Sequence, residues 1–504
     1  MDMSPKPPQP IVMSHGLRLV IFLFLMTALF MATLDNQIVS TALPTIVGEF
    51  GQFERFGWVG SAFLLATSAV MPLYGKLGDL FGRKYVMIAA VTIFTVGSAL
   101  CGLAWSMDSL IAARVFQGLG GGGIMVSIFS VNADLFEPRE RARYQSYSSL
   151  VIMASGSIGP LLGGTMSDLF GWRSIFLINL PIGVFVVAGL IFLLPNRRPD
   201  RQPRIDYVGA ILLALASTMV VLLTDGISLF GSLVSWQSAT ILAIFIVAVI
   251  SWILVERRVP EPIIPLRLFR NSTFSLFLIV SLMTGGVAIG MVNYFALFLQ
   301  ATMGLSPTHA GLFFILITGG MVVGSLSSGR LISITGRYKP FCVAGLMLNV
   351  LTLIAFSQFG AHTPLPLIGF VMMLQGLAVG LGQQAPIIGV QNSAPRADVG
   401  AATGAVTLTR MGGAAVAISI YGAVISVIMS GVSIPGVSSV GSLTPDQIAS
   451  LPEAARHAIA EAYGKAFEPM FLTAAALATM GLLAALMLKP IRLPTADAKP
   501  VKAA

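Results

Sequence analysis

One acidic and one basic side chain stand inside long apolar stretches of this sequence, where ionised groups are rare. Asp35 lies in the stretch from 17 to 41, and Arg114 lies in the stretch from 109 to 132. A charge inside a membrane is costly unless it is paired or hydrated, so such residues usually have a function. A helical rise of about 1.5 Å per residue places both at a similar depth. We predict that Asp35 exchanges a proton or a cationic substrate, and that Arg114 senses it across a cavity; structural hydrogen bonds are the alternative.

The residues that follow Arg114 repeat at the spacing of one helical face. Arg114, Gln117, Gly118 and Gly121 occupy positions i, i+3, i+4 and i+7. Small residues let helices approach closely, whereas the Arg and Gln side chains require polar surroundings. The stretch from Gly118 to Gly123 also spells G-x-G-x-x-G, but it follows no strand and lies inside an apolar run. It therefore does not indicate a nucleotide site.

Further polar residues in apolar stretches are candidates for a substrate cavity. A pocket for lipophilic molecules needs an apolar lining with few directional groups. Arg410 is a second cation inside an apolar run, and it either faces a central cavity or bonds to backbone carbonyls; the sequence leaves both open. The cavity candidates are Asn36, Gln37, Gln117, Asn293, Tyr294, Gln300, Gln383, Gln384 and Arg410.

Two glycine-containing segments could control how helices move against one another. In the loop GKLGDLFGRK (75–84), Asp79 can meet Arg83, a neighbouring helix end, or Arg143 at the start of a later apolar run. Simple anchoring of the loop by its Lys and Arg residues is the alternative. In the second segment, proline bends the helix and glycines allow tight packing, which predicts a hinge or seal. Its residues are Gly159, Pro160, Gly163 and Gly164.

The composition determines which class of protein must position these residues. The chain has 504 residues, of which 56% are hydrophobic and 10% are charged. Soluble proteins carry about 25% charged residues, so a soluble enzyme, a disordered chain and a disulfide scaffold are excluded. Cys101 and Cys342 lie in apolar runs and are expected to be inert. The sequence contains no metal-ligand spacing, catalytic constellation or P-loop, so we expect no enzyme activity, no metal and no cofactor.

The apolar runs predict an all-α integral membrane protein with 14 transmembrane spans. A membrane-crossing helix needs about 20 mostly apolar residues. The predicted spans are 17–41, 58–77, 85–105, 109–132, 144–165, 174–194, 207–225, 236–254, 273–301, 307–328, 341–359, 365–388, 401–430 and 467–488. Most of the 30 Lys and Arg residues then fall on the side of the two termini, which predicts cytoplasmic termini. The net charge of +9 is thus a topology signal, and no nucleic-acid partner is expected.

Two pairs of matching segments indicate an internal duplication. GKLGDLFGRK (75–84) matches GRLISITGRYK (329–339), and FQGL (116–119) matches LQGL (374–377) at nearly the same interval. In the second copy Ser333 stands at the position of Asp79, and Asn293 lies roughly at that of Asp35. Duplicated halves around a central site are typical of secondary transporters.

The duplication predicts how the chain is divided. A cytoplasmic tail (1–16) precedes an N-terminal six-helix bundle (17–195). Two extra transmembrane helices (196–260) then lead to a C-terminal six-helix bundle (261–490) and a cytoplasmic tail (491–504). The second bundle contains an extracytoplasmic loop at about 431–466, in which PEAARHAIAEAYGKAF is expected to form a short amphipathic helix on the outer surface.

These motifs resemble those of the major facilitator superfamily, and specifically its fourteen-span drug:proton antiporter family of multidrug efflux transporters. The resemblance rests on LDNQIVSTALP (34–44), GKLGDLFGRK, RVFQGLGGG (114–122) and SGSIGPLLGG (155–164), in order and each at the proper span. Ser155 departs from the last motif, which usually begins with glycine. The resemblance implies the major facilitator fold, with two six-helix halves and two extra helices.

The resemblance also implies roles for particular residues. It implies proton coupling by Arg114, which we expect to act together with Asp35, and it implies export as the direction associated with the motif at Gly159–Gly164. It implies a conformational latch that holds the outward-open state, formed here by Gly75, Asp79, Gly82, Arg83, Lys84 and Arg143.

The sequence therefore favours a proton-coupled multidrug exporter that works by alternating access in the cytoplasmic (inner) membrane. Its expected partners are protons, a lipophilic small-molecule substrate and the lipid bilayer, and whether a periplasmic adaptor takes part stays open. A major facilitator carrier of a specific metabolite or siderophore is one alternative. A channel or a non-transporting membrane receptor is another, although duplicated halves favour alternation over a channel.

Overall fold

A computed structural model describes residues 13–50, 56–196, 206–224, 235–305, 307–431, 452–490 and 492–493. The regular elements in these ranges are helices, together with one isolated bridge between Arg337 and Arg492. The first half contains α1 (His15–Phe50), α2 (Phe56–Phe81), α3 (Arg83–Gly102), α4 (Met107–Leu135), α5 (Pro138–Phe170), α6 (Ser174–Leu177) and α7 (Asn179–Leu193). Two helices follow, α8 (Tyr207–Thr224) and α10 (Trp236–Glu256). The second half contains η2 (Leu266–Arg270), α11 (Ser272–Ala288), α12 (Val292–Leu297), η3 (Phe298–Thr302), α13 (Pro307–Thr335), α14 (Lys339–Ser357), α15 (Leu365–Gly382), α16 (Ala385–Ser393), η4 (Arg396–Asp398), α17 (Val399–Ser430) and α19 (Glu453–Met487).

The all-helical architecture expected from the apolar runs is confirmed. Eleven helices of the described part are long and apolar enough to cross a membrane, and two shorter apolar helices lie at Tyr207–Leu223 and Ser272–Ala288. Helix α5 has 33 residues but carries many polar side chains. Each predicted span falls on helical residues, while the count of fourteen crossings stays a prediction.

Two predicted spans of the second half are broken rather than continuous, and in the first half the run 174–194 is interrupted at Ile178 between α6 and α7. The run 273–301 divides where α11 ends at Ala288, and it resumes as α12 and the π-helical turn η3. The run 365–388 divides between α15 and α16, at Gln383 and Gln384. Both breaks leave backbone groups outside the regular helical ladder, which is tolerated at membrane depth where protein or a cavity surrounds them.

The segment before the last span differs from our expectation. PEAARHAIAEAYGKAF was predicted to form a separate surface helix, but α19 runs without interruption from Glu453 to Met487. Alanine-rich sequence has a high helix propensity, so the helix continues past the apolar run. The remainder of the predicted loop, residues 432–451, lies outside the described residues.

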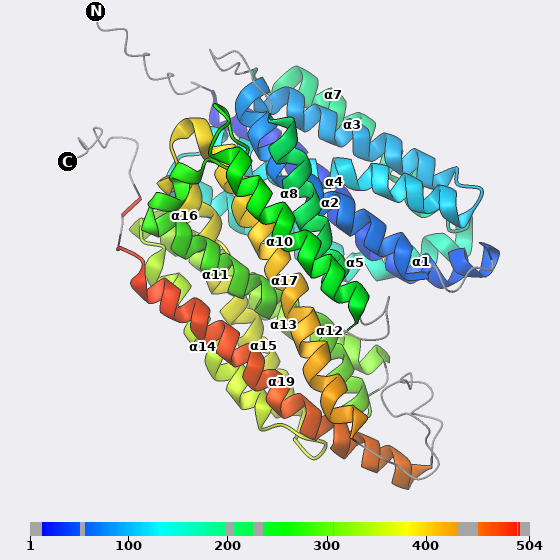
Figure 1. The fold of residues 1–504 in the computed structure, drawn as a ribbon. Coiled ribbons are helices and arrows are strands. Elements are labelled where there is room, and N and C mark those ends of the chain that lie inside the picture. Colours follow the sequence, from blue (N-terminus) through cyan, green and yellow to red (C-terminus); the bar gives the residue numbers. More distant parts are fainter. Residues whose placement is uncertain are drawn as a thin grey trace, which may run out of the picture.

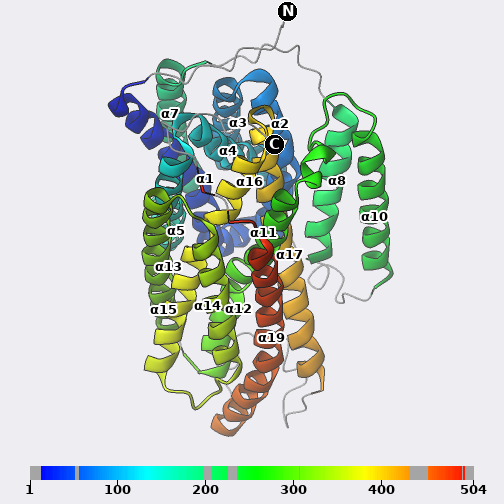
Figure 2. The ribbon, with the colours of Figure 1, turned by 90° about the vertical axis from the view of Figure 1, so that its left-hand side faces the viewer.

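The helices form two bundles with a helical pair at one side. Helices α8 and α10 pack on each other, and α8 also contacts α2 and α17. Figure 2 shows this pair beside the two bundles. Between the bundles, α2 packs on α17 and α5 packs on α13. The bundles adjoin at the end where α1 begins and α19 ends, and they diverge toward the other end (Figure 1).

Matching contacts support the internal duplication. Gly82 and Gly336 occupy equivalent loop positions, and both have positive φ angles, 91° and 67°, which favour glycine. Lys84 donates a hydrogen bond from Nζ to the carbonyl of Ile191 near the end of α7 (2.6 Å). Its counterpart Lys339 donates to the carbonyl of Leu486 near the end of α19 (2.7 Å). In each half, a lysine thus donates a hydrogen bond to a backbone carbonyl near the C-terminus of the last helix.

Candidate functional site

A buried charge pair lies in the interior of the first bundle. Arg114 Nη1 donates to Asp35 Oδ2 at 2.6 Å, and both side chains are 0% exposed. Asp35 Oδ1 accepts hydrogen bonds from Gln117 Nε2 (2.9 Å) and Asn179 Nδ2 (2.8 Å). The structure therefore brings Asp35 and Arg114 into direct contact, whereas the sequence predicted sensing across a cavity. Gln117, which was also a cavity candidate, is enclosed in this cluster.

The Arg114 guanidinium is held by several further groups. Its Nη1 also donates to Gln117 Oε1 (2.7 Å), and its Nε donates to the carbonyl of Val59 on α2 (3.2 Å). The guanidinium carbon lies 4.3 Å from the centre of the Phe63 ring, a distance at which a cation is attracted to the ring face. Its Nη2 is buried and has no hydrogen-bond partner among the described residues. This arrangement supplies donors to both oxygens of Asp35 and leaves the Nη2 group of Arg114 without a described partner.

Asn179 is a member of this cluster that the sequence analysis missed. It begins α7, and its Nδ2 donates both to Asp35 and to Ser98 Oγ on α3 (2.9 Å). Its position inside the apolar run 174–194 was the available signal, because a buried amide needs polar partners. The cluster thus joins α1, α3, α4 and α7.

The glycines of α4 bring this helix close to its neighbours. A Cβ atom at Gly118 would lie 2.6 Å from the carbonyl oxygen of Phe63 on α2. On the other side of α4, a Cβ atom at Gly97 of α3 would lie 2.6 Å from Gln117 Cα. Such approaches are possible only without side chains, as predicted for the small residues of this face.

The second bundle contains a neutral cluster at the corresponding place. Gln375, the counterpart of Gln117, donates from Nε2 to Asn349 Oδ1 (2.9 Å) and accepts a hydrogen bond from Thr352. Met372 stands where the first half has Arg114, so this cluster carries no cation. The ionisable pair is therefore a property of the first half.

Asp79 joins the two bundles at the end where α1 begins. Its Oδ2 accepts a hydrogen bond from the backbone N–H of Ala401 in the first turn of α17 (3.0 Å), and its Oδ1 accepts one from Arg83 (3.2 Å). A carboxylate at a helix N-terminus is favoured by the free N–H groups and the helix dipole. Close approach of the helices depends on Gly75, because an added Cβ atom would overlap Gly400. Two of the three partners that the sequence offered for Asp79 are thus in place.

The third offered partner, Arg143, is directed elsewhere. Its Nε donates to the hydroxyl of Tyr147, four residues further along α5 (3.0 Å). The Asp79 carboxylate is instead served by Arg83, which also contacts Asp134 of α4 (2.7 Å). The expectation that Arg143 pairs with Asp79 is therefore corrected for this conformation.

Further hydrogen bonds join the bundles near the same end. Gln384 Nε2, at the break between α15 and α16, donates to Ser149 Oγ of α5 (2.8 Å) and to Ser325 Oγ (3.0 Å). Arg141 Nη1 donates to Gln391 Oε1 of α16 (3.2 Å). Gln384, predicted to line a cavity, is buried in this contact between the halves.

The glycine-rich motif of α5 packs on α1 beside the charged cluster. A Cβ atom at Gly159 would overlap the side chain of Gln37, and one at Gly156 would be 3.7 Å from Gln37 Nε2. Gly163 is buried, and Gly164 has open space around it. The side chain of Pro160 lies outside the described residues. The motif therefore allows close contact between α5 and the span that carries Asp35.

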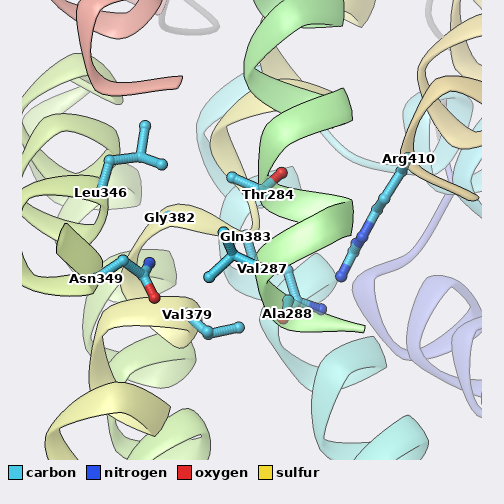
Figure 3. A pocket seen from close by; sticks show the side chains of 9 residues that line it. All are labelled: Thr284, Val287, Ala288, Leu346, Asn349, Val379, Gly382, Gln383 and Arg410. Carbon is cyan, nitrogen blue, oxygen red and sulfur yellow. The ribbon is translucent and has the colours of Figure 1, made fainter. Parts of the chain in front are cut away.

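Arg410 faces a narrow cavity in the second bundle, which in this conformation has room for about one water molecule. The cavity is lined by residues of α11, α14, α15 and α17, which Figure 3 shows: Thr284, Val287, Ala288, Leu346, Asn349, Val379, Gly382, Gln383 and Arg410. Arg410 extends toward the end of α11 (Figure 3), and no described residue forms a hydrogen bond or an ion pair with its guanidinium. Of the two possibilities left open by the sequence, the structure therefore places Arg410 at a cavity.

The other cavity candidates are distributed more widely. Tyr294 donates its hydroxyl hydrogen to the carbonyl of Ile418 (2.7 Å), and Gln300 is half-buried in η3. Asn36 is half-buried and Gln37 is exposed, both on α1. The side chain of Asn293 lies outside the described residues.

Outside the apolar spans, the far end of the first bundle is tied within itself. Glu49 accepts a hydrogen bond from Trp172 Nε1 (2.6 Å) and pairs with Arg173 (2.9 Å). The hydrogen bond from Trp172, followed by the contact with Arg173, holds the pKa of Glu49 below its usual value. These bonds join α1 to the loop before α6 at the far end of this bundle.

Comparisons with known proteins place these features in a family context. The model of the Major Facilitator Superfamily matches residues 25–418. An uncharacterized MFS-type transporter of Mycobacterium tuberculosis is 33% identical over 94% of this chain and 70% of its own length. Multidrug resistance protein 3 of Bacillus subtilis is 33% identical over 71% of this chain and 70% of its own. The crystal structure of the human organic anion transporter MFSD10 has the same fold, with a TM-score of 0.62 at 16% identity over 92% of this chain and 99% of its own.

Proposed function

The chain belongs to the Major Facilitator Superfamily of membrane transporters, and we propose that it exports lipophilic small molecules in exchange for protons. It is a multi-pass membrane transporter, not an enzyme, and its relatives include multidrug transporters and efflux pumps. Proton coupling, antiport and the direction of transport are our proposal. We also propose a cytoplasmic-membrane location, fourteen spans, cytoplasmic termini and the division into bundles given above.

The observation that carries the proposal is the enclosed carboxylate of Asp35 with its three side-chain donors. Arg114, Gln117 and Asn179 all donate to it. Protonation of Asp35 would remove its negative charge and leave the Arg114 cation unbalanced in an apolar interior, which is unfavourable. The cluster is then expected to rearrange when a proton binds.

Helix α4 offers a physical connection from this cluster to the contact between the halves. The same helix carries Arg114 near one end and Asp134 near the other, and Asp134 contacts Arg83 beside Asp79 (2.7 Å). A shift of α4 on protonation of Asp35 would therefore disturb the Asp79 contact with α17. We propose that this coupling opens the end where α1 begins and α19 ends, and that substrate then enters from the cytoplasm.

The proposal predicts that Asp35→Asn abolishes proton-driven export. Purified protein is reconstituted in liposomes, a pH gradient is imposed, and movement of a lipophilic dye is followed by fluorescence. Because asparagine is similar in size but cannot exchange a proton, export should fall to the rate of empty liposomes, with normal yield and monodispersity. Asp168→Asn, at an exposed carboxylate on α5, is the matched control and should keep the wild-type rate. Gradient-driven export by Asp35→Asn at the wild-type rate would remove Asp35 from the coupling mechanism.

A further inference from the structure

The second bundle contains a partly buried cation for which the described structure supplies no counter-charge. Arg410 lies on α17, and its Nε is buried without a hydrogen-bond partner among the described residues. The guanidinium carries its charge at every physiological pH. An unpaired cation in an apolar interior is costly and is usually retained for a function.

Arg410 also meets a cavity at the point where two helices are interrupted. Ala288 ends α11 and Gln383 follows α15, and both residues line the same cavity as Arg410. Figure 3 shows the Arg410 side chain pointing toward the last turn of α11. Interrupted helices near the middle of secondary transporters typically surround the substrate.

A second polar atom at this cavity is also unsatisfied. Gln383 donates from Nε2 to Ser149 Oγ (3.3 Å), while its Oε1 is buried without a described partner. Ser149 Oγ already accepts a hydrogen bond from Gln384 Nε2 (2.8 Å). If the Gln383 amide is turned over, its oxygen accepts from the Ser149 hydroxyl and its NH2 group becomes free to donate to a ligand. The two amide orientations are equivalent in shape.

From these features we infer that Arg410 and Gln383 form an anion-recognition subsite, which binds the carboxylate of a lipophilic substrate in a conformation that widens this cavity. A planar guanidinium can donate two parallel hydrogen bonds to a carboxylate, and the Gln383 amide can supply a third donor. Val287, Leu346 and Val379 provide the apolar part of the lining. Because Gln383 also contacts Ser149 of the first half, an occupied subsite would act on the contact between the halves.

This inference rests on the proposed function for the direction of transport, but its test is a binding measurement that needs no gradient. The probes are fluorescein and its methyl ester, which share one ring system and differ at the carboxylate. Binding to the purified full-length protein in phosphatidylcholine nanodiscs is measured by fluorescence anisotropy. Wild type should bind fluorescein about 10- to 100-fold more tightly than the ester, the range expected for hydrogen bonds to a charged group.

Substitutions then assign this preference to the subsite. Arg410→Gln should bind both dyes equally, with the affinity for the ester unchanged, whereas Arg410→Lys should keep part of the preference. Arg258→Gln removes an exposed arginine just after α10 and should behave as wild type. Unchanged ester binding shows that the Arg410 variant is folded. Equal binding of the two dyes by wild type, or an undiminished preference in Arg410→Gln, would overturn the inference.

Two further measurements are needed. The first distinguishes a substrate carboxylate from a lipid headgroup as the bound anion, and the second tests the proposed function separately from the subsite. Replacing phosphatidylcholine with phosphatidylglycerol should leave the preference intact; its loss would assign the subsite to a lipid headgroup and overturn the substrate assignment. Gradient-driven transport of fluorescein is measured separately in liposomes. Selective binding without gradient-driven transport would contradict the proposed function and leave the subsite standing.

Discussion

Each oxygen of the Asp35 carboxylate has its own side-chain donors, and this determines how the site responds to substitution. Oδ2 is bound by Arg114, while Oδ1 is bound by Gln117 and Asn179. Removing one member of a buried ion pair leaves an uncompensated charge, whereas removing both charges leaves only lost contacts. The members of the cluster should therefore be strongly non-additive.

Arg114→Met is predicted to destabilise the protein by about 3–5 kcal/mol, because it leaves the Asp35 carboxylate buried without its cation. The double variant Asp35→Asn with Arg114→Met should recover most of this loss. Chemical denaturation of the purified protein in one detergent gives the free energies of unfolding. Purely additive effects in the double variant would contradict a direct, buried pair.

The sequence identified Asp35 and Arg114 at this scale but not the cluster around them. Charges in apolar runs stand out in any sequence, since their cost does not depend on the fold. Asn179 and Ser98 are uncharged and lie in other spans, so only packing brings them to Asp35. The same limit applies to Gln384. As a polar residue in an apolar run it was predicted to line a cavity, but it lies in the contact between the two halves.

At the scale of elements, α4 depends on glycines because it lies between two close neighbours. Gly118 faces the backbone of α2, and Gly120 faces that of α3. By contrast, a Cβ atom added at Gly412 of α17 would meet nothing within 4 Å. Glycine composition alone does not distinguish these two situations.

Gly118→Ala is predicted to lower the free energy of unfolding by about 1–3 kcal/mol, because the new methyl group would lie 2.6 Å from the Phe63 carbonyl oxygen. Gly412→Ala is the matched control and should be neutral or stabilising, since alanine favours a helix and has space there. Thermal unfolding of the two variants compares them directly. Equal stability of the two variants would show that the close contact between Gly118 of α4 and Phe63 of α2 does not contribute to stability.

At the scale of elements, the breaks in two helices of the second half are the main feature that the sequence did not indicate. Hydrophobicity was continuous over 273–301 and 365–388, so a single helix was predicted for each range. The breaks occur at Ala288 and at Gln383, where both chain segments border the Arg410 cavity. A break at this depth is stabilised by its surroundings, and these belong to other parts of the chain.

For the whole molecule, the two halves are held together at the end where α1 begins. Asp79 bonds to the start of α17, and Gln384 and Arg141 add contacts between α5 and the second half. The bundles diverge toward the opposite end (Figure 1). Transport by alternating access requires these contacts to break and form again in each cycle.

Asp79→Ala is predicted to reduce the turnover rate about tenfold while KM changes little, because the lost interaction, worth about 1.4 kcal/mol or more, forms during the conformational step. Initial rates in liposomes at several substrate concentrations separate kcat from KM. Asp168→Ala, at an exposed carboxylate, is the control. A raised KM at unchanged kcat would instead assign Asp79 to substrate binding.

By itself, the sequence determined the class of molecule and its helical character, and it indicated an internal duplication. These follow from apolar runs, charge distribution and matched motifs, which are local or periodic properties of the chain. It also offered Arg83 as a partner of Asp79, because the two residues are only four positions apart in the sequence.

Only the tertiary structure decided which polar groups share an environment. It paired Asp35 with Arg114 directly, brought in Asn179, turned Arg143 away from Asp79, and left Arg410 at a cavity without a described partner. These outcomes depend on how helices distant in sequence pack and rotate against one another. Side-chain contacts between such helices vary over a few ångströms, and hydrophobic periodicity carries no information at that scale.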